Sequence, residues 1–302
     1  MTTTQPTTMR DTFGSTVSEL LDTDPRLAVV LADISATLFA EAAAKHPGRV
    51  INVGIREQLL VGVAGGLALS GMRPVVHTFA PFLVERPFEQ VKLDLGHQDV
   101  GAVLVSYGGS YDMSTEGRTH QSPADVALMD SLPGWTIHVP GHPAEADRAL
   151  RTAIAGDDRV YVRLSSRSNA EPVPGTGVRV VRPGTRGVVL AVGPVLDHVL
   201  AATDTLDVAV AYTSTVRPLD GTGLRSAVLA ADRSDVVLVE PYLAGTSAHL
   251  VNAALEDLPH RVRSLGVSRE FEVRMYGSPT DHDAVHGLDP AGIAAAVRSF
   301  LR

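Results

Sequence analysis

The chain has 302 residues, of which 44% are apolar and 20% charged, a composition typical of a globular enzyme with about two domains. Its net charge of -8, without a run of Lys or Arg, argues against a nucleic-acid partner, and the absence of cysteine excludes disulfides, thiolate nucleophiles and cysteine-ligated metals. Because no apolar span is long enough for a membrane helix and the polar N-terminus lacks a signal-peptide core, we expect a cytoplasmic protein.

The first half of the chain alternates apolar strands with helical segments. The polar, Thr-rich residues 1–12 predict a disordered tail, with helical spacing from about residue 11 to 22. Continuous apolar runs such as 27–32 are typical of strands buried on both faces of a parallel sheet. An α/β domain is therefore predicted over 13–170. Its strands are expected at 27–32, 50–53, 74–79, 101–107, 135–140 and 160–165.

A Pro- and Gly-rich stretch at 171–186 predicts a linker with one edge strand. Beyond it, apolar runs spaced by helical segments predict a second, smaller α/β domain over 187–302. The expected strands are 187–192, 208–212, 235–240 and 262–267. The fold class is thus two open, mostly parallel-sheet α/β domains.

The sequence Gly54-Ile55-Arg56-Glu57-Gln58 opens a helix that is rich in Ala and Gly. Because Gly weakens a helix, Gly62, Gly65 and Gly66 indicate that another backbone approaches closely. Glu57 would lie at the mouth of this tightly packed junction, where its proton affinity matters most. The alternative is an ordinary first-turn glutamate favoured by the helix dipole.

Several motifs in one order carry a family resemblance: GIREQ, HTFAPFLVERPFEQV, TEGRTHQSPADVALM and YGSPTDHDAVHGLD. Together they resemble the C-terminal half of transketolase and the matching part of deoxyxylulose-phosphate synthase, over roughly residues 13–300. The resemblance implies a thiamine-diphosphate pyrimidine-binding domain followed by a transketolase C-terminal-like domain.

By this resemblance, Glu57 binds a pyrimidine ring nitrogen and drives the imino tautomer that activates the cofactor. Ile55 of the same motif is expected at the cofactor, and Phe79 and Phe82 are expected to stack on the aminopyrimidine. Simple core packing is the alternative for both rings. Some relatives have a Tyr where this chain has Glu85.

The loop Glu116-Gly117-Arg118-Thr119-His120-Gln121 is similar to the family's D-G-P-T-H-Q. The resemblance implies that His120 is catalytic and also binds the sugar near the reacting carbon. Glu116 replaces an Asp that reads sugar hydroxyls, and Arg118 replaces a Pro. We expect both to bind substrate, and the added cation suggests a substrate with an anionic group.

Three further residues are predicted to contact substrate. Arg163 and Arg167 flank the region where transketolases place a phosphate-binding arginine, and guanidinium forks suit phosphate oxygens. The spacing differs by one residue, so either arginine is a candidate. Ser35 lies near a family phosphate-contact serine, but we expect no arginine to accompany it in this chain.

The family holds Mg²⁺ and the cofactor's diphosphate through a Gly-Asp-Gly motif, which this sequence lacks. We therefore expect the Mg²⁺ ligands on a partner chain that resembles the N-terminal half of transketolase, with two copies of each chain. The resulting prediction is the C-terminal subunit of a split transketolase. Alternatives are the beta subunit of a 2-keto-acid dehydrogenase or a synthase-type enzyme, and a non-catalytic regulatory partner.

Overall fold

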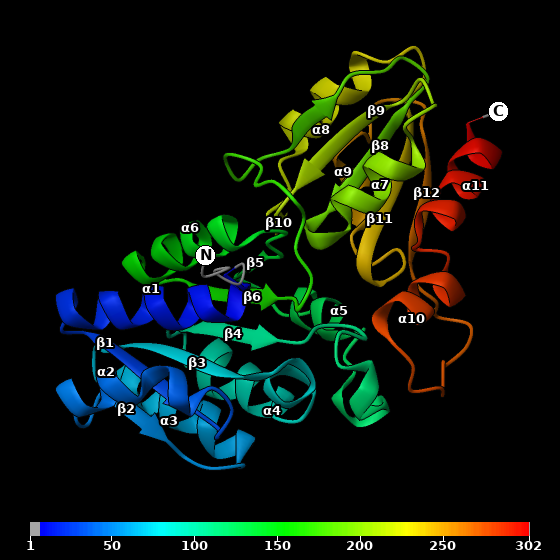
Figure 1. Cartoon of the computed structure of the whole chain (residues 1–302). Helices are drawn as coiled ribbons and strands as arrows, with labels where there is room; N and C mark the ends of the chain where they lie inside the picture. Colours follow the sequence, from blue (N-terminus) through cyan, green and yellow to red (C-terminus); the bar gives the residue numbers. More distant parts are fainter. Residues whose placement is uncertain (1–6, 302) are drawn as a thin grey trace, which may run out of the picture.

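The computed structural model describes residues 7–301, and these form two β-sheets covered by helices (Figure 1). The first sheet has seven strands in the order β10-β5-β6-β4-β3-β1-β2. All neighbours in it are parallel except β10, which runs antiparallel to β5. In chain order its strands are β1 Leu27–Leu31, β2 Val50–Asn52, β3 Arg73–Phe79, β4 Val103–Tyr107, β5 Trp135–His138, β6 Arg159–Leu164 and β10 Thr215–Arg217.

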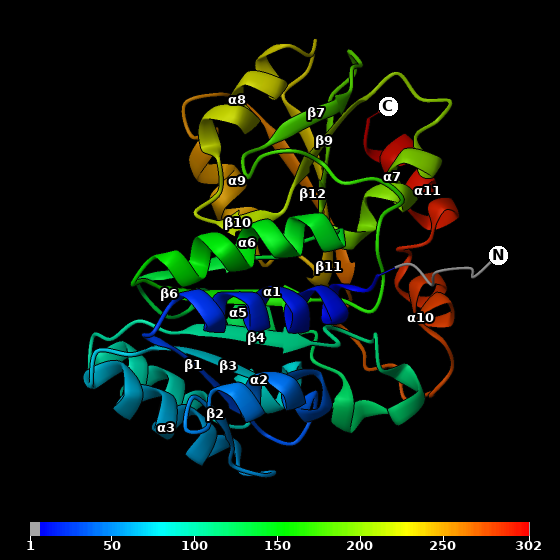
Figure 2. The same ribbon diagram turned by 60° about the vertical axis from the view of Figure 1, so that its left-hand side comes forward.

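Helices cover both faces of this sheet. On one face α1 (Met9–Thr23) and α6 (Pro143–Ala155) lie side by side, as Figure 2 shows. On the other face lie α3 (Glu57–Leu69) and α5 (Asp125–Asp130). Alternate residues of β1 serve the two cores: Val29 and Leu31 pack with α1 and α6, whereas Val30 packs with α3. This double burial explains the continuous apolar runs of the central strands.

The second sheet has five strands in the order β12-β11-β8-β9-β7. They are β7 Arg179–Arg182, β8 Val188–Val192, β9 Ala209–Thr213, β11 Asp235–Leu243 and β12 Arg261–Val267. The predicted edge strand of the 171–186 stretch is β7, which pairs antiparallel with β9. The helices that cover the second sheet are α7 Leu196–Ala202, α8 Gly221–Leu229, α9 Ala248–Ala254 and α11 Pro290–Phe300. Among them, α7 packs against α11 and α8 against α9.

One strand crosses from the second half of the chain into the first sheet. Strand β10 follows β9 after a single residue and pairs with β5, through Thr215 opposite His138 and Arg217 opposite Ile137. Nearby, the Tyr212 hydroxyl donates to Glu145 of α6 at 2.5 Å. The sequence did not predict β10, because three residues are too few for a periodic pattern.

The helix at the N-terminus begins earlier than predicted. Thr8 and Asp11 form a capping box, so α1 begins at Met9, and residues 9–12 of the predicted tail are helical. The rest of that prediction, residues 1–6, lies outside the described range. Between β1 and β2 lie a 3₁₀ turn, η1 Ala36–Phe39, and then α2 Ala40–Lys45.

The segment after β3 is less regular than predicted. Two π-helical turns, η2 (Pro81–Glu85) and η3 (Val91–His97), flank α4 (Phe88–Gln90). The Ser122 hydroxyl, just before α5, donates to Glu85 at 2.8 Å and does not cap that helix. Within residues 7–301, none of the helices is both long and apolar enough to cross a bilayer.

Candidate active site

Glu57 is the first residue of α3 and is almost completely buried, with 2% of its surface exposed. Gly54, with φ of +69°, makes the turn that leads from β2 into this helix. The Glu57 carboxylate accepts a hydrogen bond from the Arg86 guanidinium at 2.6 Å. Ile55, two residues before it, is 69% exposed and points away from the protein core. Glu57 is thus a buried carboxylate whose charged partner is the partly exposed Arg86.

The close approach predicted for the Gly-rich helix is real at Gly65 and absent at Gly66. A Cβ on Gly65 would lie 2.7 Å from the backbone oxygen of Asp94 in η3, whereas one on Gly66 would meet nothing within 4 Å. Gly62 faces the Asp94 side chain. Tight packing of η3 against α3 therefore fixes the helix on which Glu57 is carried.

Two phenylalanines and a histidine form an aromatic cluster beside Glu57. Phe79 ends β3 and Phe82 lies in η2, with ring centroids 6.1 Å apart. The His120 ring lies edge-on to both, at 5.6 Å from Phe79 and 5.0 Å from Phe82. The structure thus brings together three predicted site residues from two separate segments of the chain, β3–η2 and the 3₁₀ turn Arg118–His120.

Arg86 joins the carboxylate to this cluster. Its guanidinium carbon lies 4.1 Å from the centroid of the Phe82 ring while its Nη1 donates to Glu57. The Arg86 guanidinium is a flat group that rests on Phe82 and donates an N–H to Glu57. An aminopyrimidine ring is also flat and carries N–H donors, so Phe82 and Glu57 fit the pyrimidine half of thiamine diphosphate. Sequence reasoning quoted Arg86 within a motif but did not identify it as a site residue.

Glu85 stands at the rim of the cluster, where the sequence departs from some relatives. Its carboxylate accepts from Ser122 at 2.8 Å, and burial raises its pKa. Glu85 therefore supplies a polar contact between η2 and the loop that follows His120, in place of an aromatic ring.

Glu116 and Arg118 lie on exposed short turns next to His120. Arg118 donates to the Gln121 carbonyl oxygen at 2.8 Å and pairs with Glu272 at 3.3 Å. Both members of that ion pair are about half exposed, so a substrate anion can compete for Arg118.

The structure corrects the expectation for Arg163. Its side chain is 1% exposed and donates to Asp125 and to Ser110, each at 2.7 Å. Arg163 therefore forms a buried structural ion pair with Asp125 and does not face a substrate. Arg167 also has protein partners, since it donates to Asp283 at 2.8 Å and lies 3.5 Å from Asp112.

Ser35 lies in the loop after β1, where it and Asp33 both have φ of +63°. Its hydroxyl lies 2.9 Å from the Nε2 atom of the buried His77, whose Nδ1 lies 2.7 Å from the Val105 carbonyl oxygen. Since Nδ1 must donate to that carbonyl, Nε2 accepts the serine proton. Burial lowers the pKa of His77 to about 4, which keeps the ring neutral.

An arginine does accompany Ser35 in space. The Nε atom of Arg10, on α1, donates to the Ser35 hydroxyl at 2.9 Å. Sequence reasoning missed Arg10 because it lies 25 residues away, within the predicted tail. Within residues 7–301, no group of three or more His, Cys, Asp or Glu side chains is placed to hold a metal ion.

Comparison with known proteins gives a consistent picture. The family described as transketolase, pyrimidine binding domain, matches residues 5–171. An uncharacterized 33.6 kDa protein in the fasciation locus of Rhodococcoides fascians is 60% identical, over 98% of this chain and 95% of its own length. The 6-deoxy-6-sulfo-D-fructose transketolase subunit SqwH of Clostridium sp. (strain MSTE9) is 29% identical, over 86% of this chain and 84% of its own.

Two further matches concern the extent of the chain. The 1-deoxy-D-xylulose-5-phosphate synthase of Leptothrix cholodnii is 32% identical over 97% of this chain, which spans 48% of that enzyme. Among solved structures, a split-gene transketolase, described as an inactive beta4 tetramer, superposes with a TM-score of 0.85 and 26% identity. The match covers 97% of this chain and 98% of that one. The chain therefore belongs to the transketolase family and carries its pyrimidine-binding domain.

Proposed function

We propose that the chain is one subunit of a two-chain, thiamine-diphosphate-dependent transketolase that transfers a two-carbon ketol unit from a ketose to an aldose. The observation that carries this proposal is the convergence of a buried Glu57 with Phe79, Phe82 and His120. These side chains come from three separate segments and have no need to meet for packing alone.

Each residue has a defined part in the proposed reaction. Thiamine diphosphate, when bound, supplies the nucleophilic carbon that carries the two-carbon unit. Glu57 would hydrogen-bond a nitrogen of the pyrimidine ring and share a proton with it in a site shielded from water. Phe82 and Phe79 provide an apolar face for the ring, and Ile55 lies at the exposed edge, where a partner chain would cover it. His120 exchanges hydrogen bonds or a proton with the sugar near its reacting carbon.

The partner in this proposal carries the Mg²⁺ and diphosphate site, with two copies of each chain. Two findings support the arrangement: the chain spans about half of the synthases that it matches, and its structural neighbour is one chain of a split-gene transketolase that is inactive as a tetramer of one chain type. A pull-down of the tagged chain from native extract, with mass spectrometry, tests it. A stoichiometric partner with Gly-Asp-Gly is the expected result.

We further propose that the substrate carries an anionic group. Arg10, whose Nε donates to the Ser35 hydroxyl, is the cation available for it. Glu116, on an exposed turn next to His120, is placed to bind sugar hydroxyls. The Clostridium relative, which is named for a sulfonated fructose, supports an anionic sugar.

The decisive experiment is a turnover assay of the reconstituted complex with ketose phosphates, a sulfonated ketose and 2-keto acids. Glu57→Gln should lower turnover by roughly 10²–10⁴-fold, the range of general acid–base catalysis. Glu89→Gln, at a glutamate whose side chain is 61% exposed, is the matched control and should retain full activity. Turnover of 2-keto acids alone would instead favour a decarboxylating or synthase-type enzyme, and full activity of Glu57→Gln would favour a regulatory subunit.

A further inference from the structure

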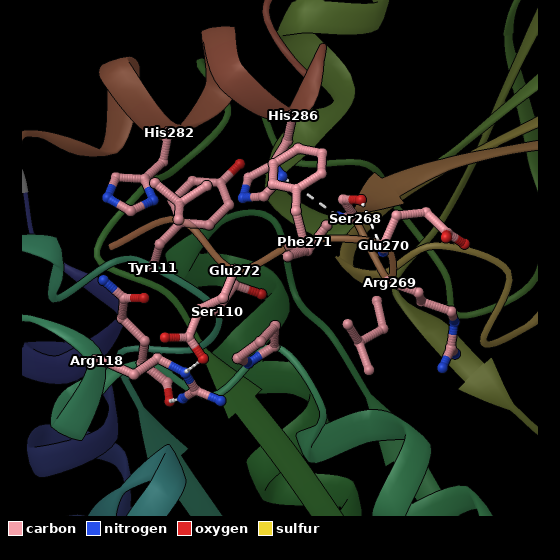
Figure 3. A pocket seen from close by; sticks show the side chains of 15 residues that line it. Ser110, Tyr111, Arg118, Ser268, Arg269, Glu270, Phe271, Glu272, His282 and His286 are labelled. Carbon is pink, nitrogen blue, oxygen red and sulfur yellow. Dashed lines mark hydrogen bonds and ion pairs between the residues drawn. The ribbon is translucent and has the colours of Figure 1, made fainter. Parts of the chain in front are cut away.

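A cavity of about 430 Å³ lies between the loop that carries His120 and the C-terminal part of the chain (Figure 3). Tyr111, Arg118 and Gln121 line it from the first half of the chain, and the segment 267–273 with helix α10 (Pro279–His286) encloses it from the second. His120 does not line this cavity, because its ring faces Phe79 and Phe82. Its size is that of a small-molecule site.

Gln121 provides the first sign of a missing ligand. Its side chain is 6% exposed, and within the described residues its Nε2 atom has no hydrogen-bond partner. Buried amide groups are nearly always hydrogen-bonded, because the free-energy cost of removing one from water is otherwise not offset. Gln121 lines the cavity, so a turn of its amide would present Nε2 to an acceptor atom there.

Two further donors with free capacity line the cavity, beside the carboxylates of Glu270 and Glu272. The Nδ1 atom of His286 accepts from the backbone N–H of Ser268 at 3.3 Å, so the neutral ring carries its proton on Nε2. Burial lowers the pKa of His286, which favours that neutral form. Arg118 uses Nη1 and Nε for Gln121 and Glu272, which leaves Nη2 available.

Stacked rings form the wall beside these donors. The Tyr111 ring lies at 5.1 Å from His282 and 5.6 Å from His286, and Phe271 stacks on His286 at 5.7 Å. Figure 3 shows the four rings in a row above Arg118. Such a wall provides contact area for a flat or ring-shaped molecule.

The Glu272 carboxylate is bound to Arg118, in the position where we expect a ligand anion to bind. The carboxylate lies 3.3 Å from Nε of Arg118, with side-chain exposures of 47% for Arg118 and 52% for Glu272. An ion pair as exposed as this is weak, so a ligand anion can displace Glu272.

We propose that this cavity is a second ligand site, which binds a small ring-bearing molecule with a carboxylate, phosphate or sulfonate group. The anion binds Arg118 and Gln121, and the ring rests against Tyr111 and the two α10 histidines. The site needs no thiamine diphosphate, and a ligand there contacts the loop of His120 from the side opposite the aromatic cluster.

Calorimetric titration of the full chain without cofactor tests this site, with phenyl phosphate, inorganic phosphate and phenol as probes. Phenyl phosphate should bind at least tenfold more tightly than either fragment. Arg118→Gln and Gln121→Leu should each weaken it at least tenfold, and Gln121→Glu serves if the leucine variant does not fold. Glu272→Gln should tighten binding about two- to fivefold, the effect of losing an exposed competing ion pair.

Arg225→Gln is the matched control, since Arg225 also lies in an ion pair with an exposed carboxylate, that of Asp257, and should leave the affinity unchanged. The proposal fails if phenyl phosphate shows no saturable binding, if phenol or inorganic phosphate binds equally well, or if Arg118→Gln and Gln121→Glu bind as the unaltered chain does. None of these outcomes depends on transketolase activity, so failure here leaves the proposed function intact.

Discussion

The pairing of Glu57 with Arg86 can be measured by a double-mutant cycle on the chain alone, with Arg86→Met, Glu57→Gln and the double variant. The Glu57 side chain is 3% exposed and that of Arg86 is 43% exposed, so the pair is half-buried. Hydrogen bonds to charged groups contribute about 1.5–3 kcal/mol when buried, and exposed ion pairs about 0.2–1 kcal/mol. We therefore expect a coupling free energy of about 1–2 kcal/mol.

The two single variants should differ in cost. Arg86→Met leaves a carboxylate buried without its partner, whereas Glu57→Gln leaves a guanidinium that water can reach, so Arg86→Met should lower the free energy of unfolding more. Urea unfolding followed by the fluorescence of Trp135, the single tryptophan, provides the measurement. A coupling below about 0.5 kcal/mol, or a larger cost for Glu57→Gln, would refute the reasoning. The exposed pair Lys92–Glu89 is the control and should show a coupling of at most about 0.5 kcal/mol.

Three further predictions concern packing, burial and pH. Gly65→Ala should destabilise the chain by about 1–3 kcal/mol, because its methyl group would lie 2.7 Å from a backbone oxygen, whereas Gly66→Ala should stabilise it by about 0.5–1 kcal/mol; equal urea midpoints would contradict both. Arg163→Met should lower the free energy of unfolding by about 3–5 kcal/mol by leaving the Asp125 carboxylate unpaired, and a variant of normal stability but impaired phosphate binding would restore Arg163 as a substrate residue. Burial lowers the pKa of His77 to about 4, so between about pH 6.5 and 4 the unfolded chain binds a proton that the native chain does not. This residue therefore makes the free energy of unfolding decrease as the pH is lowered from about 6.5 to 4. A His77 NMR titration midpoint above about pH 6 would overturn this.

The central strands were predictable because burial on both faces leaves an unmistakable apolar run, as in Leu27–Leu31. Glu57, Phe82 and His120 were identified through motifs, and the structure brings them to one place. The resemblance, not periodicity, carried that part of the site.

Other features depend on contacts that no local pattern records. Arg10 reaches Ser35 from a helix that the polar N-terminal composition concealed, and Arg86 reaches Glu57 because a π-helical turn sets its position. The family resemblance and residue type made Arg163 one of two candidates for phosphate binding. Its burial against Asp125 arises from the packing of β6 against α5, which only the tertiary structure reveals.

The crossing of β10 into the first sheet has a consequence for how the protein is made. On the ribosome, β5 is complete at residue 138, but its outer partner is synthesised only at residues 215–217. Until then β5 presents an open hydrogen-bonding edge that another nascent chain can occupy. The same holds for a proteolytic fragment cut at the Pro- and Gly-rich stretch 171–186, which would keep every catalytic candidate yet expose that edge. Completion of the first sheet thus depends on a strand from the second half of the chain, although the proposed catalytic residues all lie in the first.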